Sequence, residues 1–202
     1  MPSTMIHLLV AHEIKSEAPD LFWLGNFAPD YTNDRESKDR IHLRDVSDRR
    51  SALGKLYADI DKNNWFELGW FLHLFVDACW EENHITDYYN WFVSSNEKDN
   101  WFSNYRGEIG FASYYLYHNL SWSKEIWNLV KNLQLSDIKT SLPITISDVE
   151  WYRDKVFQKH TESDPTQLPK FFTVDKIMDF SKVTAVRYKE WLDIQNQGPL
   201  IH

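Results

Sequence analysis

The 202-residue chain contains one cysteine, Cys79, so it can form no internal disulfide bond and no cysteine-rich zinc site. Glycine and proline are also scarce, with six and seven residues, which favours helices joined by modest loops over a turn-rich β fold. No stretch reaches the roughly 18–20 apolar residues that a membrane span requires. The N-terminus shows no basic region followed by an apolar core and a cleavage site. We therefore expect a cytoplasmic protein without a membrane span.

Positive charge is in deficit as well. The chain has 22 lysines and arginines against 30 aspartates and glutamates, a net charge of −8. Non-specific binding to nucleic acid depends on basic side chains that neutralise phosphates, so we expect no stable nucleic-acid binding. A substrate that carries phosphate stays compatible with this acidic total, because a bound metal ion supplies positive charge locally.

Large aromatic side chains are abundant, at 16% of the chain, and argue against disorder. We predict an all-α fold, a single-domain multi-helix bundle over residues 1–202. Residues 31–40 and 94–106 are expected to be loops, and 161–169 a linker before the C-terminal helix. The apolar segment 21–30 is interrupted at Gly25 and ended by Pro29. Helices are expected at about 4–16, 42–60, 65–82, 85–93, 108–119, 122–133, 147–160 and 173–192.

The most informative segment is Phe66–Trp80, FELGWFLHLFVDACW, an apolar run that holds His73 and Asp77 in its interior. These two residues are four apart, so on a helix both project from the same face. Burying an imidazole and a carboxylate is costly unless they are paired or bound to a metal. The simpler interpretation is a hydrogen bond between His73 and Asp77 inside the core.

Histidines and an aspartate that precede this segment favour a metal site. The ordered set is His7, Asp30, His42, His73 and Asp77. Imidazole and carboxylate are ligands of zinc, iron, manganese and nickel. Two such ions can share a bridging carboxylate, and Asp77 is the natural candidate. Taken alone, His7 is typical of a half-buried core histidine, Asp30 of a turn and His42 of a surface residue.

Four segments together resemble the zinc-dependent phospholipase C family, which is related to single-strand-specific zinc nucleases. They are MPSTMIHLLVAHEI, FWLGNFAPD, HLRD and GWFLHLFVDACW, within about residues 1–85. The resemblance implies an all-α fold with a cluster of metal ions, most of all zinc. Its pattern is an early His, an Asp closing G-x-x-x-P-D, a His shortly after, and H-x-x-x-D on a helix. The matching positions are His7, Asp30, His42, His73 and Asp77.

The family pattern continues with a further His and an H-x-x-x-E that complete a third metal site. Here His84 lies near the first of these positions, but no His is followed four residues later by Glu. His160 is followed at that distance by Asp164, and His118 is another possible ligand. We therefore predict one or two metal ions and leave a third open.

These residues predict a metal-dependent hydrolase that attacks a phosphate ester with metal-activated water, on a small molecule or a phospholipid. His42, His73, Asp30 and Asp77 would hold one ion, and His7 with Asp77 would hold or approach another. Asp77 and Asp45 are the expected catalytic residues, with Asp45 orienting the water, although Asp30 could do so if it is not a ligand. Among Lys38, Arg40 and Arg44, Arg44 is the best candidate to receive the substrate phosphate.

Two other interpretations stay open. A phosphohydrolase of the HD superfamily also uses His and Asp ligands, but that family pairs them directly and no His-Asp dipeptide occurs here. A non-catalytic helical binding module could keep a structural metal or a buried His–Asp pair. The two classes differ in coordination, because a hydrolase needs an open position and a structural site is closed by protein ligands.

Overall fold

The computed structural model describes residues 1–32, 34–95 and 98–197, which form helices and connecting segments without a β-strand. The predicted all-α fold is confirmed. No helix in this described part is long and apolar enough to cross a bilayer. The helices are α1 Thr4–Ile14, α2 Asp20–Phe27, η1 Ala28–Tyr31, α3 Arg35–Ile41, α4 Arg49–Asp59, α5 Trp65–Val93, η2 Lys98–Asn100, α6 Trp101–Asn119, α7 Ser123–Asn132, η3 Leu135–Asp137, α8 Ile146–Thr161 and α9 Val174–Gln197, where η marks a short 3₁₀ helix.

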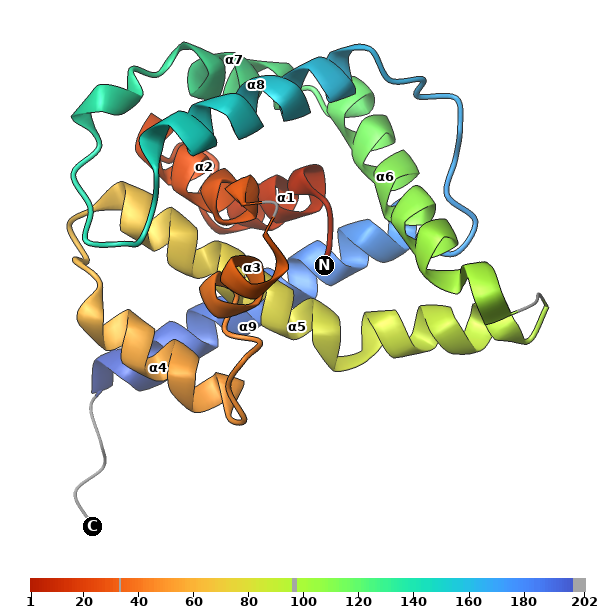
Figure 1. The fold of residues 1–202 in the computed structure, drawn as a ribbon, viewed down its shortest axis with the longest axis horizontal. Coiled ribbons are helices and arrows are strands. Elements are labelled where there is room, and N and C mark those ends of the chain that lie inside the picture. The colour runs from red at the N-terminus through yellow and green to blue at the C-terminus, as the bar shows by residue number, and fades with distance from the viewer. Residues whose placement is uncertain (33, 96–97, 198–202) are drawn as a thin grey trace.

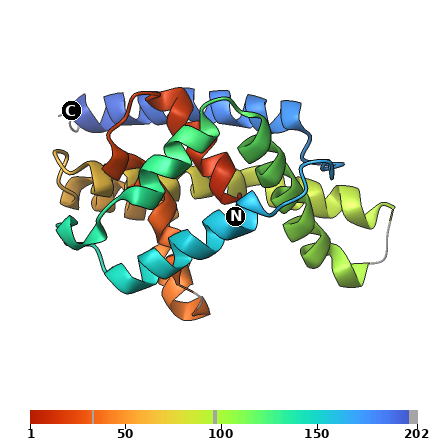
Figure 2. The ribbon, with the colours of Figure 1, turned by 90° about the horizontal axis from the view of Figure 1, so that it is seen from above.

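The longest helix, α5, organises the molecule. It runs across the middle of the ribbon in Figure 1 and packs against α1, α2, α4 and α9. Figure 2 shows α9 along one side and α3 and α8 on the other, with α1 and α2 between them. The first half of α5 is buried on nearly all sides, as expected for an apolar helix in the centre of a core.

Two glycines set the distance between α2 and α5. A Cβ atom added to Gly25 would collide with the backbone carbonyl of Phe66, and one added to Gly69 would collide with the carbonyl of Phe22. The two helices therefore cross with their backbones almost in contact. The expectation that Gly25 interrupts the apolar segment is wrong, because α2 continues through it. Gly25 serves the close approach of the two helices and not a break in one of them.

The segment between α2 and α4 also differs from the prediction. Residues 31–40 were expected to be a loop but contain α3, because the Asp34 carboxylate accepts a hydrogen bond from the Ser37 N–H at 2.8 Å and caps the helix. The helix expected at 42–60 begins only at Arg49, where the Asp48 side chain caps α4. Between the two, Leu43 has a φ of 53°, a left-handed conformation that ends α3 beside His42.

Three other helix boundaries are corrected. The helices expected at 65–82 and 85–93 form one continuous α5, since nothing in the intervening residues ends a helix. The loop expected at 94–106 ends early, because α6 begins at Trp101. Helix α8, expected to begin at Ser147 as a capping box, begins at Ile146 and has Thr145 at its N-cap position. Residues 162–173 connect α8 to α9, and the Glu108 carboxylate holds that connection by accepting the N–H groups of Lys170 and Phe171 at 2.8 and 2.7 Å.

A buried polar chain joins α1, α6 and α8 away from the predicted ligands. The His160 Nδ1–H donates to the carbonyl of Val156 at 2.8 Å, so its Nε2 accepts the Ser113 hydroxyl at 2.9 Å. Ser113 in turn accepts the backbone N–H of Met5 at 3.3 Å. Burial lowers the pKa of His160 to about 4. His160 is therefore neutral at pH 7 and part of the core.

We expect His160→Gln to reduce the loss of the free energy of unfolding that occurs as the pH falls from about 7 to about 4.5. The folded pKa of about 4 lies below the ordinary histidine value of about 6.5, so the unfolded chain binds the additional proton between these values. The contribution of His160 to the free energy of unfolding is therefore fully present above about pH 6.5. It decreases as the pH falls toward 4, by up to about 3 kcal/mol. Urea unfolding at about pH 4.5 and about pH 7, with excess chelator for both proteins, measures this. An equal pH dependence in parent and variant would contradict the assignment.

Candidate metal centre

The five predicted ligands come together between α1, η1, α3 and α5. His7 projects from α1, Asp30 from η1, and His42 follows the last turn of α3. His73 and Asp77 come from the same face of α5, one turn apart. All five side chains are buried, and His42 and Asp77 are completely inaccessible to solvent. Four segments of the chain thus deliver imidazole and carboxylate groups to one point.

The two oxygens of Asp77 face different histidines. Its Oδ1 lies 3.4 Å from the Nε2 of His7. Its Oδ2 lies 3.6 Å from the Nε2 of His42 and 3.9 Å from the Nε2 of His73. Asp77 therefore stands between two sets of imidazoles, as a carboxylate that bridges two ions would.

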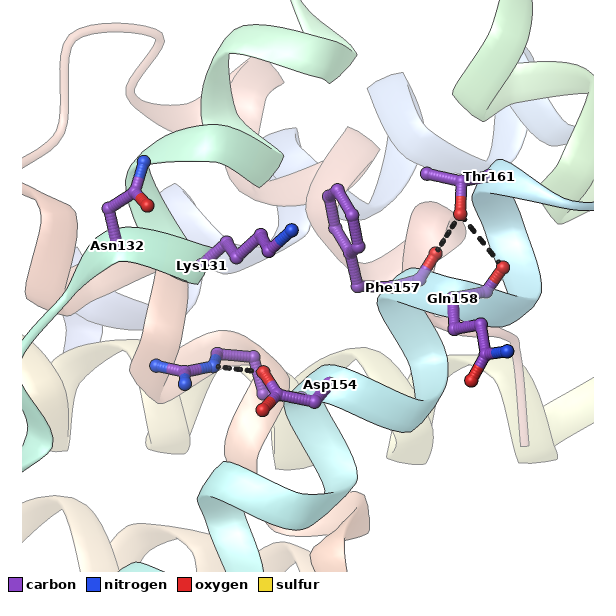
Figure 3. Close-up of a pocket in the computed structure, with 7 residues that line it drawn as sticks. Lys131, Asn132, Asp154, Phe157, Gln158 and Thr161 are labelled. Atoms are coloured by element: carbon purple, nitrogen blue, oxygen red, sulfur yellow. Dashed lines mark hydrogen bonds and ion pairs between the residues drawn. The ribbon is translucent and has the colours of Figure 1, made fainter.

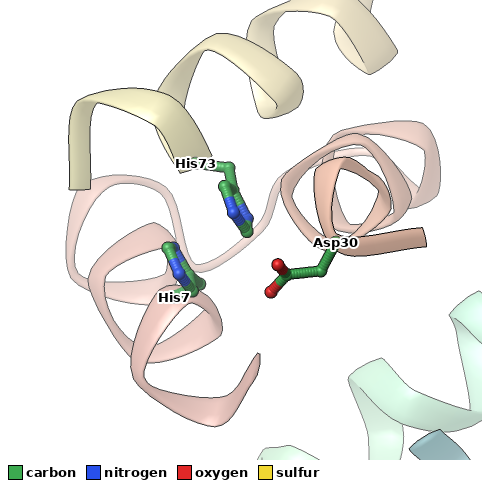
Figure 4. Close-up of side chains that lie close together, drawn as sticks. All are labelled: His7, Asp30 and His73. Atoms are coloured by element: carbon green, nitrogen blue, oxygen red, sulfur yellow. The ribbon is translucent and has the colours of Figure 1, made fainter. Parts of the chain in front are cut away.

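Asp30 and His7 complete the arrangement. Asp30 Oδ1 lies 3.5 Å from the Nε2 of His42. The His7 and His73 rings are stacked with their centroids 3.7 Å apart, and Figure 4 shows both rings beside the Asp30 carboxylate. Ligand atoms of His7, Asp30 and His73 lie within 4.8 Å of one another, and so do those of His42, His73 and Asp77.

These separations suit a metal ion better than direct hydrogen bonds. Hydrogen bonds between nitrogen and oxygen are about 2.7–3.2 Å long, and the distances from the imidazoles to Asp30 and Asp77 are longer. Ligands about 2.0–2.2 Å from a zinc ion are roughly 3.4 Å apart in a tetrahedron. The direct His73–Asp77 hydrogen bond considered from the sequence is not formed, since the two atoms are 3.9 Å apart.

Hydrogen bonds to backbone carbonyls orient two of the imidazoles. The Nδ1 of His73 lies 2.7 Å from the carbonyl of Asn26, and the Nδ1 of His42 lies 2.8 Å from the carbonyl of Lys38. Because a carbonyl only accepts, each Nδ1 carries the proton and each Nε2 offers a lone pair to the cluster. Ligand histidines in metalloproteins are held in this way.

Several buried atoms have no hydrogen-bond partner in the described part of the chain. They include the Nε2 atoms of His7, His42 and His73 and the Oδ1 of Asp77. An unsatisfied buried polar atom costs about 1–3 kcal/mol, so four at one point would be a large penalty for a purely structural core. All four are nitrogen or oxygen donors suited to zinc, iron, manganese or nickel. The residues present therefore fit a metal centre.

The electrostatics of the cluster favour the protonation states that bind metal. Burial alone would raise the pKa of the Asp30 carboxyl, but the Lys38 ammonium and the His42 imidazole hold that pKa well below its usual range. Burial likewise opposes ionisation of Asp77, yet His7 and His73 lower its pKa. The pKa of His73 is well below its ordinary value because of its burial and of the stacked His7. Ionised carboxylates and a neutral His73 are the forms that coordinate a metal.

Basic side chains lie directly against the cluster. The Lys38 ammonium is 2.7 Å from Asp30 Oδ1. The Nη2 of Arg44, the residue predicted to bind a substrate phosphate, is 3.1 Å from Oδ2 of the predicted ligand Asp77. Arg49 lies next to Arg44 and forms an ion pair with Glu81 at 2.6 Å.

Three other predicted residues are not brought to the cluster. Asp45 is exposed and lines a surface hollow with Asp39 and Arg40. In the described part of the chain it forms no ion pair with the basic side chains that contact the cluster. His84 stacks on Trp80 at 4.6 Å, farther along α5. His118 contacts the carbonyl of His160 at 3.1 Å, on the α6–α8 side. Neither histidine belongs to the two ligand groups, so we assign no metal to them and no water-orienting role to Asp45.

The surface hollow in Figure 3 is also separate from the cluster. It lies between α7 and α8, has a volume of about 510 Å³, and contains none of the five ligands. Its polar lining is an ordinary solvated surface, with Arg153 bound to the adjacent Asp154 at 3.0 Å. This hollow therefore contributes nothing to the candidate metal centre.

Three residues that touch the cluster or its neighbours were not predicted from the sequence. Glu81 had a detectable signal, because it follows Asp77 by four residues and extends the His73–Asp77 face of α5. The Asn26 carbonyl and the Arg49 side chain had none. They reach the cluster only through the α2–α5 crossing and the turn before α4.

Comparison with known protein families gives a match over most of the chain. The family described as zinc dependent phospholipase C matches residues 2–147, which include all five ligands and extend past the segments that suggested the resemblance. A search of curated proteins and a search of solved structures each found no match.

Proposed function

Since the chain belongs to the zinc-dependent phospholipase C family, we propose that it is a metal-dependent hydrolase that cleaves phosphate esters as a phosphodiesterase. The observation that carries this proposal is the position of Asp77 between two sets of histidines, with one carboxylate oxygen toward each. A single structural ion would need no such bridge. Two ions that share a carboxylate are a recurrent arrangement in enzymes that act on phosphate esters.

His42, His73 and Asp77 would hold one ion, with Asp30 beside them. His7 and the other oxygen of Asp77 would hold a second, for which fewer protein ligands are at hand. A metal site with fewer than four protein ligands keeps positions open for water and substrate, whereas a structural zinc site is closed. When bound, the ions would activate a water molecule and offset the negative charge that develops on the phosphoryl oxygens.

The chain's own residues would supply position and charge. The Asn26 and Lys38 carbonyls keep the Nε2 atoms of His73 and His42 directed at the cluster. Arg44, beside Asp77, would donate hydrogen bonds from its guanidinium group to a substrate phosphoryl oxygen. The substrate class that fits is a phosphate ester, either a small molecule or a phospholipid headgroup. Zinc is the proposed metal, and iron, manganese and nickel also accept these ligands.

Elemental analysis of the freshly purified protein, together with a phosphodiesterase assay, tests the proposal. We expect one or two equivalents of zinc, iron or manganese, and hydrolysis of bis(p-nitrophenyl) phosphate that a chelator abolishes and metal restores. A metal-containing protein that hydrolyses no phosphate ester would favour a structural metal in a binding module. A well-folded protein that neither contains nor takes up these ions would overturn the proposal.

A further inference from the structure

Two arginines and a glutamate form a connected group beside Asp77. Arg44 Nη2 lies 3.1 Å from Asp77 Oδ2, and its Nε donates to Glu81 at 2.8 Å. Arg49 Nη1 donates to the other oxygen of Glu81 at 2.6 Å, and its Nη2 lies 4.0 Å from Asp77 Oδ2. Glu81 thus holds both guanidinium groups against the outer side of the cluster.

This group lies on a side of the cluster that is partly exposed to solvent. The side chains of Arg44, Arg49 and Glu81 are 21%, 17% and 25% exposed, whereas that of Asp77 is 0% exposed. A substrate that approaches the buried ligands from this side must pass the two guanidinium groups. Their charges therefore act on the substrate before and during its contact with the site.

The two arginines differ in how fully their donors are used. Arg44 pairs with Asp77 and Glu81 and lies 3.9 Å from Asp39 Oδ1, whereas Arg49 has its close ion pair with Glu81, which it shares with Arg44. In the described part of the chain, the Nε and Nη2 atoms of Arg49 are buried and have no hydrogen-bond partner. Unused buried donors on a cation favour an anionic ligand.

We propose that Arg44 and Arg49, held by Glu81, form an anion-recognising side of the site that selects phosphodiesters with a net negative charge over those with a cationic headgroup. The proposal rests on the proposed phosphodiesterase function and names its substrate class. A quaternary ammonium group attached to the phosphate would lie close to the two guanidinium groups and be repelled. An additional anionic oxygen at the same place would receive their hydrogen bonds.

Glu81 competes with the substrate for the same donors, so variants at Arg49 and Glu81 should act in opposite directions. Arg49→Met removes a donor group and should lower kcat/KM for the anionic substrate bis(p-nitrophenyl) phosphate by about 10- to 100-fold, the range for losing a hydrogen bond to a charged group. The loss should be smaller for the zwitterionic p-nitrophenyl phosphorylcholine, which shares the phosphodiester anion and the leaving group, because the same substitution also removes the repulsion between Arg49 and the quaternary ammonium group. Glu81→Gln frees both guanidinium groups and should raise the preference for the anionic ester.

A matched control separates recognition from a structural ion pair. Arg187 and Glu82 form an ion pair at 2.8 Å between α9 and α5, away from the ligands, so Arg187→Met should leave the ratio of the two kcat/KM values unchanged. Arg49→Lys keeps the charge and provides the comparison if Arg49→Met does not fold. Arg49→Lys should lower kcat/KM for the anionic ester less than a neutral residue does, because it loses the two-pronged hydrogen bonding of the guanidinium group but keeps the positive charge.

Binding can be measured without turnover. Inorganic phosphate titrated calorimetrically into the metal-loaded protein should bind more weakly to Arg49→Met and more tightly to Glu81→Gln, with metal content equal to that of the parent. If both variants change kcat/KM for the two substrates equally, or phosphate affinity is unchanged, the arginines only hold the α3–α4 connection and the start of α4 against α5, and the inference is wrong. If the metal-loaded parent hydrolyses no phosphodiester, the proposed function fails first, and phosphate binding alone then decides whether the anion site exists.

Discussion

Asp77→Asn is expected to remove metal from the protein and to lower phosphodiesterase activity by at least about 100-fold, since even residues that only support a ligand change affinity or activity by about 10- to 100-fold. Asp77 offers Oδ1 to His7 and Oδ2 to His42 and His73, so the substitution affects both proposed ions at once. Asparagine has nearly the same shape but is neutral, and it offers one oxygen in place of two. The loss should therefore come from coordination and not from packing.

Elemental analysis, activity and thermal unfolding of the same preparations measure this result. His73→Ala should lose metal as well, but it also leaves a cavity, so Asp77→Asn is the cleaner variant. Asp179→Asn, the same chemical change at an exposed position of α9, is the control and should retain the parent's metal content. An Asp77→Asn protein that keeps its metal and its activity would rule out the bridging role.

Gly69→Ala is expected to destabilise the fold by more than about 3 kcal/mol, beyond the usual cost of overpacking a core. The added Cβ would collide with the backbone carbonyl of Phe22 and approach the N–H of Asn26. Neither is the flexible end of a side chain, so α2 and α5 would have to move apart. Because the Asn26 carbonyl holds the His73 imidazole, the same movement should weaken metal binding. Gly25→Ala should behave similarly, through the carbonyl of Phe66.

Chemical denaturation of Gly69→Ala and Gly110→Ala provides the comparison. Gly110 lies within α6, and the nearest atom to an added Cβ there is in the Tyr114 ring at 3.9 Å, an ordinary contact. Alanine is favoured over glycine within a helix by about 0.5–1 kcal/mol, so Gly110→Ala should be neutral or stabilising. Equal effects of the two substitutions would show that close helix packing is not what Gly69 provides.

Much of the site was predictable because its ligands carry short-range signals. His73 and Asp77 share a helix face through their spacing alone, and the segment around them is too apolar to be a surface. The G-x-x-x-P-D segment and the two other histidines added Asp30, His42 and His7 through the family resemblance. The helix at 35–41, which was not predicted, also has a local sequence signal. Asp34 precedes it, and its side chain caps the helix.

Other features depended on contacts between distant segments. Gly25 looked like a helix break because its local propensity is poor, and only the backbone of α5 shows what the missing side chain permits. Asp45 and Arg44 are adjacent in sequence, yet Arg44 turns toward Asp77 and Asp45 toward solvent. Both residues lie in the short connection between the left-handed Leu43 and the α4 cap at Asp48. Arg49 reaches Glu81 from a different helix, which no sequence spacing reports.

The sequence by itself determined the helical class and the five residues suited to hold metal, because periodicity, composition and short motifs are properties of neighbouring residues. Only the tertiary structure decided that one oxygen of Asp77 faces His7 and the other faces His42 and His73. It also decided that Arg44 and Arg49 both donate hydrogen bonds to Glu81 beside this cluster. Those relations arise where α1, α3, α4 and α5 meet, and their distances follow from the packing of these segments against one another.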